Sequence, residues 1–223
     1  MRVLIVLCLC GLSVPLSAQT KLRTFTSPDG VFRFEHSEML VDCMSERSQP
    51  NASTSGVPKV FVGHPVGSSV PDSCSSQAGI CGAPSSIGNS VACFAYPKGK
   101  FKEKKTFSAA AFFVSEIGDA TTEKDCLQGS PYWNMDDIKT GSATLNGVTF
   151  KVFEVDQHWL GGGQGGPVYR AFHAKKCYEL GIQTAGSSPG NYDPGTFKEF
   201  TQRDRNEVQG RLKQALSSFR FVK

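Results

Sequence analysis

Several patterns that mark particular functions are missing from this sequence. No cysteine or histidine pair stands at the short Cys-x-x-Cys or His-x-x-x-His spacing of zinc sites. The histidines are scattered along the chain, at His36, His64, His158 and His173. The formal net charge is only +4, and Arg2 contributes one of these charges. We therefore predict no metal site and no nucleic-acid binding.

Long apolar runs are also missing, with one exception at the beginning of the chain. There Arg2 precedes the apolar run from Val3 to Leu12, and small residues follow at Ser17-Ala18. This order is typical of a secretory signal peptide, and the run is shorter than the roughly 20 residues that a membrane span needs. We predict a signal peptide over residues 1–18, a single domain over residues 19–223, a secreted or periplasmic location and no membrane span.

Two enzyme-like motifs occur without the structural context that they require. The glycines between Gly161 and Gly166 match the G-x-G-x-x-G spacing of dinucleotide sites, but Pro167 and a predicted strand follow instead of a helix. The stretch Gly186–Gly190 matches the G-x-S-x-G letters of hydrolases, but Pro189 follows the serine. We therefore predict no cofactor and no serine nucleophile.

Cysteines are plentiful by contrast. Of the eight, six remain outside the predicted signal peptide, and an even number in an exported chain indicates disulfides. The short separation of one pair favours a local bond, because closing a short loop costs little entropy. The pairs that we predict are Cys74–Cys81, Cys126–Cys177 and Cys43–Cys93.

Strand patterns dominate the rest of the chain. Asn146-Gly147 predicts a tight hairpin turn, and residues 148–155 alternate as a strand after it. Residues 106–115 are apolar on both faces, which is typical of a central strand covered on both sides. The glycine-rich run from Leu160 to Pro167 is predicted to be a loop. Further strands are predicted at residues 31–36, 39–43, 59–63, 90–96, 168–174 and 177–185.

Helix signals are few. Thr196 with Glu199 fits a capping box and predicts a long helix over residues 197–217. Its apolar positions recur at helical spacing, at Val208, Leu212, Ala215, Leu216 and Phe219. Thr122 with Asp125 predicts the beginning of a short helix that carries Cys126.

Charged residues are mostly predicted to lie on solvated surfaces. The lysines between Lys98 and Lys105 are interpreted as a solvated hairpin loop. The acidic residues Glu154, Asp156 and Glu179 are interpreted as the solvated face of alternating strands.

Short segments together resemble the PsbP-like superfamily. They are Ser27–Phe34, Asn146–Phe150, Tyr169–His173 with Cys177–Leu180, and Ser218–Phe221. The resemblance is to uncharacterised exported bacterial members of that superfamily. It implies a PsbP-like α+β fold, with a central antiparallel sheet of about six strands flanked by helices, here with added disulfides. It also implies a non-enzymatic role in binding other proteins.

Three functional hypotheses remain open. The first is an exported, non-catalytic binding or scaffold domain for an unknown protein, with His158, Trp159, Tyr169 and Arg170 as its contact surface. The second is an extracytoplasmic enzyme in which Cys177 is the nucleophile and His173 the base. The third is a small-ligand-binding domain with a pocket under the Gly161–Gly166 loop.

Overall fold

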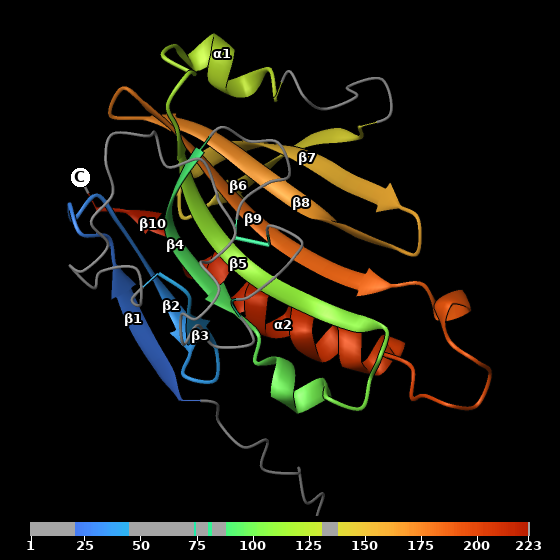
Figure 1. Ribbon diagram of the computed structural model, residues 1–223. Coiled ribbons are helices and arrows are strands. Elements are labelled where there is room, and N and C mark those ends of the chain that lie inside the picture. The colour runs from blue at the N-terminus through green and yellow to red at the C-terminus, as the bar shows by residue number, and fades with distance from the viewer. Residues whose placement is uncertain (1–20, 45–73, 75–79, 82–87, 131–137, 223) are drawn as a thin grey trace, which may run out of the picture.

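The computed structural model describes residues 21–44, 74, 80–81, 88–130 and 138–222 (Figure 1). The predicted signal peptide and the predicted strand at residues 59–63 lie outside these residues. The strands are β1 (Leu22–Thr26), β2 (Phe32–Ser37), β3 (Val41–Asp42), β4 (Gly88–Ala95), β5 (Phe107–Ile117), β6 (Thr140–Leu145), β7 (Val148–Trp159), β8 (Gly162–His173), β9 (Lys176–Ser187) and β10 (Arg220–Phe221). The helices are α1 (Glu123–Leu127) and α2 (Gln202–Ser218), with 3-10 turns η2 (Lys98–Phe101) and η3 (Pro189–Asn191).

Two antiparallel sheets form the framework. The larger one has seven strands in the order β3-β4-β5-β9-β8-β7-β6, and the smaller one has the order β1-β2-β10. The predicted antiparallel arrangement is confirmed, but the described chain is richer in strand than a single sheet of about six. The Asn146-Gly147 turn joins β6 to β7 as predicted, with positive φ at both residues. The strand predicted at residues 39–43 is the short β3, which pairs with β4.

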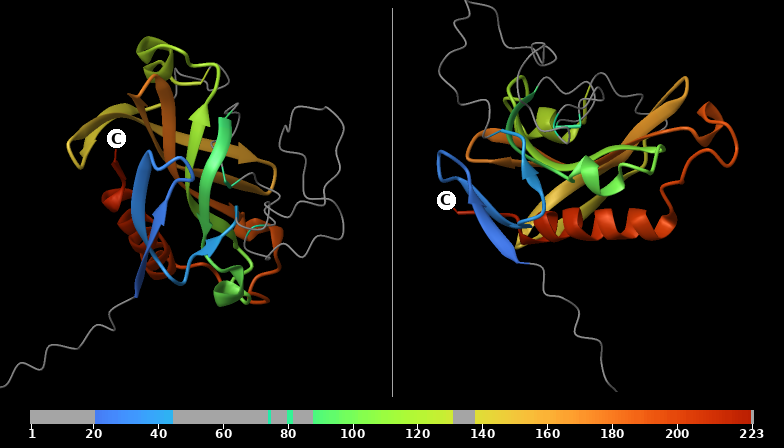
Figure 2. Two further views of the ribbon diagram at one scale, coloured as in Figure 1. Left: turned by 90° about the vertical axis from the view of Figure 1, so that its left-hand side faces the viewer. Right: turned by 60° about the horizontal axis from the view of Figure 1, so that its bottom comes forward.

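One face of the larger sheet packs against α2, and the smaller sheet closes this layer (Figure 2). The buried stripe of α2 consists of Val208, Leu212, Ala215 and Leu216. These side chains belong to one apolar core with Phe112 and Ile182 of the large sheet and Phe32 and Phe34 of β2. The four helical positions recur at intervals of three or four residues, so they lie on one side of the helix.

Among the residues that the structure describes, no second long helix covers the opposite face of the sheet, although the sheet was expected to be flanked by helices. The core on that face combines Ala109, Ala111 and Phe113 of β5 with Ile80 and four of the cysteines. Residues held by disulfides therefore cover part of this face of the sheet, where a helix was expected. The short helix α1 lies by the end of β8 and the beginning of β9 (Figure 1), where Cys126 is bonded to Cys177. Of the helices that the structure describes, none is long and apolar enough to span a bilayer.

The long helix begins later than predicted. Its N-cap is Thr201, and Asp204 completes the capping box by accepting a hydrogen bond from the Thr201 amide at 2.8 Å. Asp204 also pairs with Lys104 at 2.7 Å. Ahead of the cap, Phe200 is buried and its amide bonds the Thr106 hydroxyl at 2.8 Å. These tertiary contacts outweigh the local signal at residue 196.

The predicted glycine loop is mostly strand. Residues from Gly162 onward belong to β8, which pairs with β7 on one side and β9 on the other. Two flanking strands supply backbone partners to this segment, and they override the poor strand propensity of glycine. Only the turn at Leu160 and Gly161 separates β7 from β8.

The lysine-rich segment 98–105 is only partly a solvated loop. It forms η2 and a turn, with Phe101 buried beneath it. Lys100 pairs with Glu207, and Lys104 pairs with Asp204. These ion pairs attach the segment to the first half of α2.

Candidate functional site

The glycines of β8 provide room for the side chains of the neighbouring strand. In the register of the sheet, Asp156 lies opposite Gly165, His158 opposite Gly163 and Trp159 opposite Gly162. A Cβ atom at Gly163 would lie 2.9 Å from the His158 Nδ1, and one at Gly162 would lie 3.0 Å from the Trp159 Nε1. At Gly165 the added atom would overlap the Asp156 carboxylate. Side chains of β7 therefore lie flat across the glycines of β8.

A groove with a volume of about 700 Å³ follows from this arrangement. It lies between the ends of β7, β8 and β9 and the chain that enters α2. Farther along the sheet, Phe150 and Ile182 fill the space toward the helix. Near the groove the sheet carries glycines instead, and the space stays open. The walls include Asp156, His158, Gly163, Gly165, Phe200 and Arg205.

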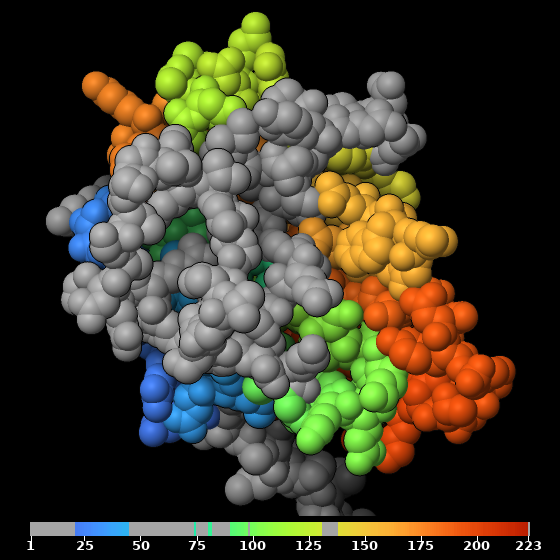
Figure 3. Space-filling view, in the orientation of Figure 1, coloured from blue at the N-terminus to red at the C-terminus, as the bar shows by residue number. Residues whose placement is uncertain are grey.

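The turn at the mouth of the groove is held in place by the segment after β9. The Gly161 carbonyl accepts a hydrogen bond from the Ser188 amide at 2.9 Å and another from the Asn191 side-chain amide. Gly161 has φ +86°, which favours glycine. The two segments lie side by side at one end of the molecule (Figure 3). Trp159 is 48% exposed, and Leu160 is fully exposed.

The wall formed by the chain entering α2 combines an aromatic ring with charge. The Arg205 guanidinium lies 5.6 Å from the centre of the buried Phe200 ring. Glu199 lines the same wall, and Asp156 faces the groove from the sheet. The groove thus offers aromatic surfaces, hydrogen-bonding groups and charges of both signs. No cysteine is among the described residues that line it.

The structure separates the four residues of the predicted contact surface. His158 and Trp159 line the groove. Tyr169 is half-buried against the α2 core, and burial, with a smaller contribution from Glu154, raises the pKa of its hydroxyl. Arg170 is buried, so its assignment to a contact surface is wrong.

Arg170 instead forms a buried ion pair with Glu179, which corrects the interpretation of Glu179 as solvated. The Arg170 Nη2 lies 2.7 Å from the Glu179 Oε2, and the two side chains are 2% and 0% exposed. The residues face one another across the β8–β9 hairpin. Its two-residue turn at Ala174-Lys175 sets this register, so the hairpin turn was the signal that could have found the pair.

The nucleophile hypothesis for Cys177 is wrong, because this residue is disulfide-bonded to Cys126 as predicted. A disulfide sulfur offers no thiolate for attack. His173 instead stacks on Phe221, with ring centres 3.9 Å apart.

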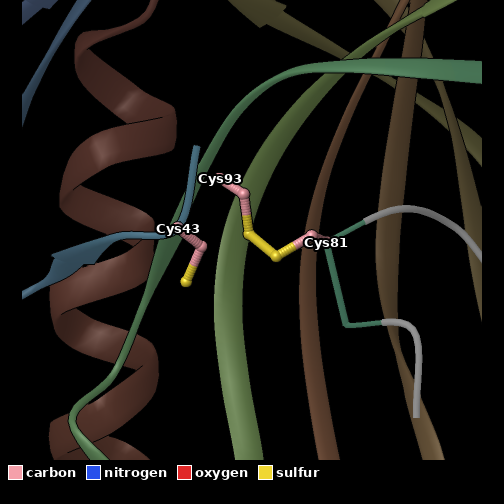
Figure 4. Close-up of side chains that lie close together, drawn as sticks. All are labelled: Cys43, Cys81 and Cys93. Atoms are coloured by element: carbon pink, nitrogen blue, oxygen red, sulfur yellow. A yellow bond between two sulfur atoms is a disulfide. The ribbon is translucent and has the colours of Figure 1, made fainter. Parts of the chain in front are cut away.

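The other two predicted disulfides are wrong, since Cys43 is bonded to Cys74 and Cys81 to Cys93. The fold brings the Sγ atoms of Cys43, Cys81 and Cys93 within 4.8 Å of one another (Figure 4). Pairing is therefore set by positions in space, and the short sequence separation between Cys74 and Cys81 does not decide it. All six cysteines outside the predicted signal peptide are disulfide-bonded.

Comparisons with known proteins give only a weak structural likeness. No protein-family model matches the chain, and no curated protein matches it. Among solved structures, cyanobacterial PsbP (CyanoP) from Synechocystis sp. PCC 6803 is similar with a TM-score of 0.39 and 9% identity. That match covers 94% of this chain and 98% of that one.

Proposed function

We propose that this protein is an exported, non-catalytic binding domain whose ligand site is the groove beside the glycines of β8. The observation that carries the proposal is the open space of about 700 Å³ over Gly163 and Gly165, with Trp159 at its mouth. This volume falls within the roughly 300–1,000 Å³ of typical small-molecule sites. Three disulfides are typical of an oxidising compartment, which supports export.

The chemistry of the groove favours a ligand with both a flat apolar surface and hydrogen-bonding groups. Trp159 and Phe200 provide aromatic surfaces at the mouth and the wall. Asp156, His158 and Arg205 provide polar groups around them. A site of this kind orients a ligand through a few polar contacts and gains affinity from aromatic burial.

A protein partner is the second candidate, and one feature supports it. Trp159 and Leu160 form an exposed apolar pair at the end of the β7–β8 hairpin. Exposed aromatic residues of this kind are frequent in the centres of protein contacts. A protein partner would cover the hairpin end, whereas a small ligand would enter the groove behind it.

A matched pair of glycine variants tests the groove. Gly163→Val fills the floor, and Gly141→Val adds the same side chain on β6, where no atom lies within 4 Å. Native mass spectrometry of the protein from its exporting host, followed by a thermal-shift screen of small molecules, would identify ligands. We expect them to stabilise the wild type and Gly141→Val by about 3 kcal/mol at a hundredfold excess over Kd, but not Gly163→Val.

Two outcomes would contradict the proposal. Ligands that stabilise all three proteins equally would place the binding site away from the groove. If no ligand is found and Trp159→Ala with Leu160→Ala abolishes binding of a purified partner protein, the protein-contact candidate replaces the small-ligand site.

A further inference from the structure

Two disulfides lie next to one another at the β3–β4 edge of the large sheet. Cys43 follows β3, and Cys93 lies within β4. The Cys43 amide donates a hydrogen bond to the Cys93 carbonyl at 2.9 Å. The Sγ atoms of Cys43, Cys81 and Cys93 all lie within 4.8 Å of one another, and the three residues are buried (Figure 4). A thiolate at Cys43 would therefore have a disulfide within reach.

The same sulfurs also fit a second pairing. Val41 pairs with Ala95 and Asp42 with Phe94. Continued by one residue, in line with the hydrogen bond from the Cys43 amide to the Cys93 carbonyl, this register places Cys43 opposite Cys93. Opposite residues of antiparallel strands have Cα atoms about 4.5–5.5 Å apart, within the range that a disulfide spans. A Cys43–Cys93 bond would leave Cys74 and Cys81, which are close in sequence, to bond with each other.

We propose that these four cysteines form a disulfide-exchange centre. In the proposed reaction, the pairs Cys43–Cys74 and Cys81–Cys93 convert into Cys43–Cys93 and Cys74–Cys81, with a small-molecule thiol as catalyst. This inference rests on the cysteine cluster alone and does not depend on the groove.

The exchange consists of three balanced steps. An external thiolate attacks the Cys74 sulfur, forms a mixed disulfide with Cys74 and releases Cys43 as a thiolate. The Cys43 thiolate then attacks the Cys93 sulfur, which forms Cys43–Cys93 and releases the Cys81 thiolate. Finally, Cys81 attacks the mixed disulfide at Cys74, forms Cys74–Cys81 and returns the external thiolate. The number of disulfides in the protein is unchanged, so no oxidant is consumed.

The exchange would alter how the sheet face is covered. In the observed pairing, Cys74 and Cys81 are each bonded to a cysteine at the sheet edge, and Ile80 between them is buried in the core beside Phe113. In the second pairing no disulfide joins Cys74 or Cys81 to the sheet. Ile80 would lose that attachment, and we expect this apolar face to become accessible.

A single substitution isolates the central step. Cys74→Ser leaves Cys43 as a free thiol beside the Cys81–Cys93 bond. After acid quenching and labelling with N-ethylmaleimide under denaturing conditions, we expect the label on Cys81 or Cys93 as well as on Cys43. Thermolysin cuts before aliphatic residues such as Ile80, so its peptides separate these positions. The control is Cys126→Ser, in which no further described sulfur gathers around Cys177, and the label should stay on Cys177.

The unmodified protein provides the second test. Incubation with less than one equivalent of glutathione should produce Cys43–Cys93 and Cys74–Cys81 peptides, while Cys126–Cys177 stays intact. Binding of a hydrophobic dye should increase as the new peptides appear. Label confined to Cys43 in a folded Cys74→Ser variant would overturn the proposal. If that variant does not fold, an unchanged disulfide pattern in the glutathione-treated protein would overturn it equally.

Discussion

The buried ion pair between Arg170 and Glu179 allows a quantitative test of the structure. Its side chains are 2% and 0% exposed, and two Arg170 nitrogens contact the Glu179 Oε2, at 2.7 and 2.8 Å. The Arg170 Nη1 also lies 3.5 Å from the Cys126 carbonyl. The pair therefore joins β8, β9 and α1 in a place that water does not reach. We predict that Glu179→Gln, which keeps the shape but removes the charge, is strongly destabilising.

The expected magnitude follows from the burial. Removal of one partner leaves the guanidinium buried without its carboxylate, which costs about 3–5 kcal/mol. Folded domains are stable by roughly 5–15 kcal/mol in total, so the loss is a large fraction of this stability. For a chain of this length, we expect the melting temperature to fall by roughly 10 °C.

Urea denaturation with a double-mutant cycle measures this effect. The cycle compares Glu179→Gln, Arg170→Met and the double variant. The double variant should lose much less free energy of unfolding than the sum of the two single losses. The control is Lys198→Met, because Lys198 pairs with Glu103 while their side chains are 70% and 72% exposed. That change should leave the urea midpoint close to that of the wild type, because water screens an exposed pair. Additive losses, or a loss below about 1 kcal/mol for Glu179→Gln, would refute the buried pair.

Three further predictions concern the rest of the fold. Asp204→Asn should cost about 1 kcal/mol at neutral pH, after allowance for solvent screening, because it weakens the capping box and removes the ion pair with Lys104. The hydrogen bond from Lys104, with those from Thr201, holds the pKa of Asp204 at about 2. The folded pKa lies below the unfolded one, so this contribution is present above about pH 4 and is lost as the pH falls toward 2. The difference between Asp204→Asn and wild type in urea titrations should shrink over that range, and a constant difference would contradict the assignment. Replacement of Cys126 and Cys177 by alanine should cost about 4 kcal/mol in the chain-entropy model, since the bond spans 51 residues, and calorimetry that finds no loss would contradict it. Gly166→Ala should cost about 2 kcal/mol or more, because Gly166 has φ +144° and an added Cβ would overlap the Ile182 carbonyl. Gly141→Ala is its control, with an expected loss within about 0.5 kcal/mol, and equal melting temperatures for the two variants would refute the close approach.

Local sequence signals predicted those elements whose stability is decided locally. The Asn146-Gly147 turn needs positive φ at two residues, and few other sequences permit it. The cap at Thr122 binds the Asp125 amide at 3.2 Å, as its spacing predicts. The central strand β5 is apolar on both faces because β4 and β9 flank it and both sides are covered. In these places a short continuous segment of the chain carries the information.

Features that depend on distant contacts were missed. Thr196 and Thr201 carry similar capping signals, and contacts with distant residues favour Thr201: Lys104 pairs with Asp204, and the Phe200 amide bonds the Thr106 hydroxyl. Arg170 and Glu179 are buried because other parts of the chain cover their face of the sheet. The alternation of polar and apolar residues along a strand does not reveal whether a face is covered. The disulfide pairs likewise depend on where β3 and β4 meet.

The glycines of β8 show why the failed prediction and the candidate site coincide. Without a Cβ atom, glycine has a low strand propensity, so the segment was predicted to be a loop. The same missing atom lets Asp156 and His158 lie across the strand and leaves the space toward α2 open. A sequence selected for stability alone would place apolar side chains at Gly163 and Gly165, as it does at Phe150 and Ile182 of the same layer. Local rules are broken most often where function requires it, and this groove is therefore the part of the molecule where binding is to be sought first.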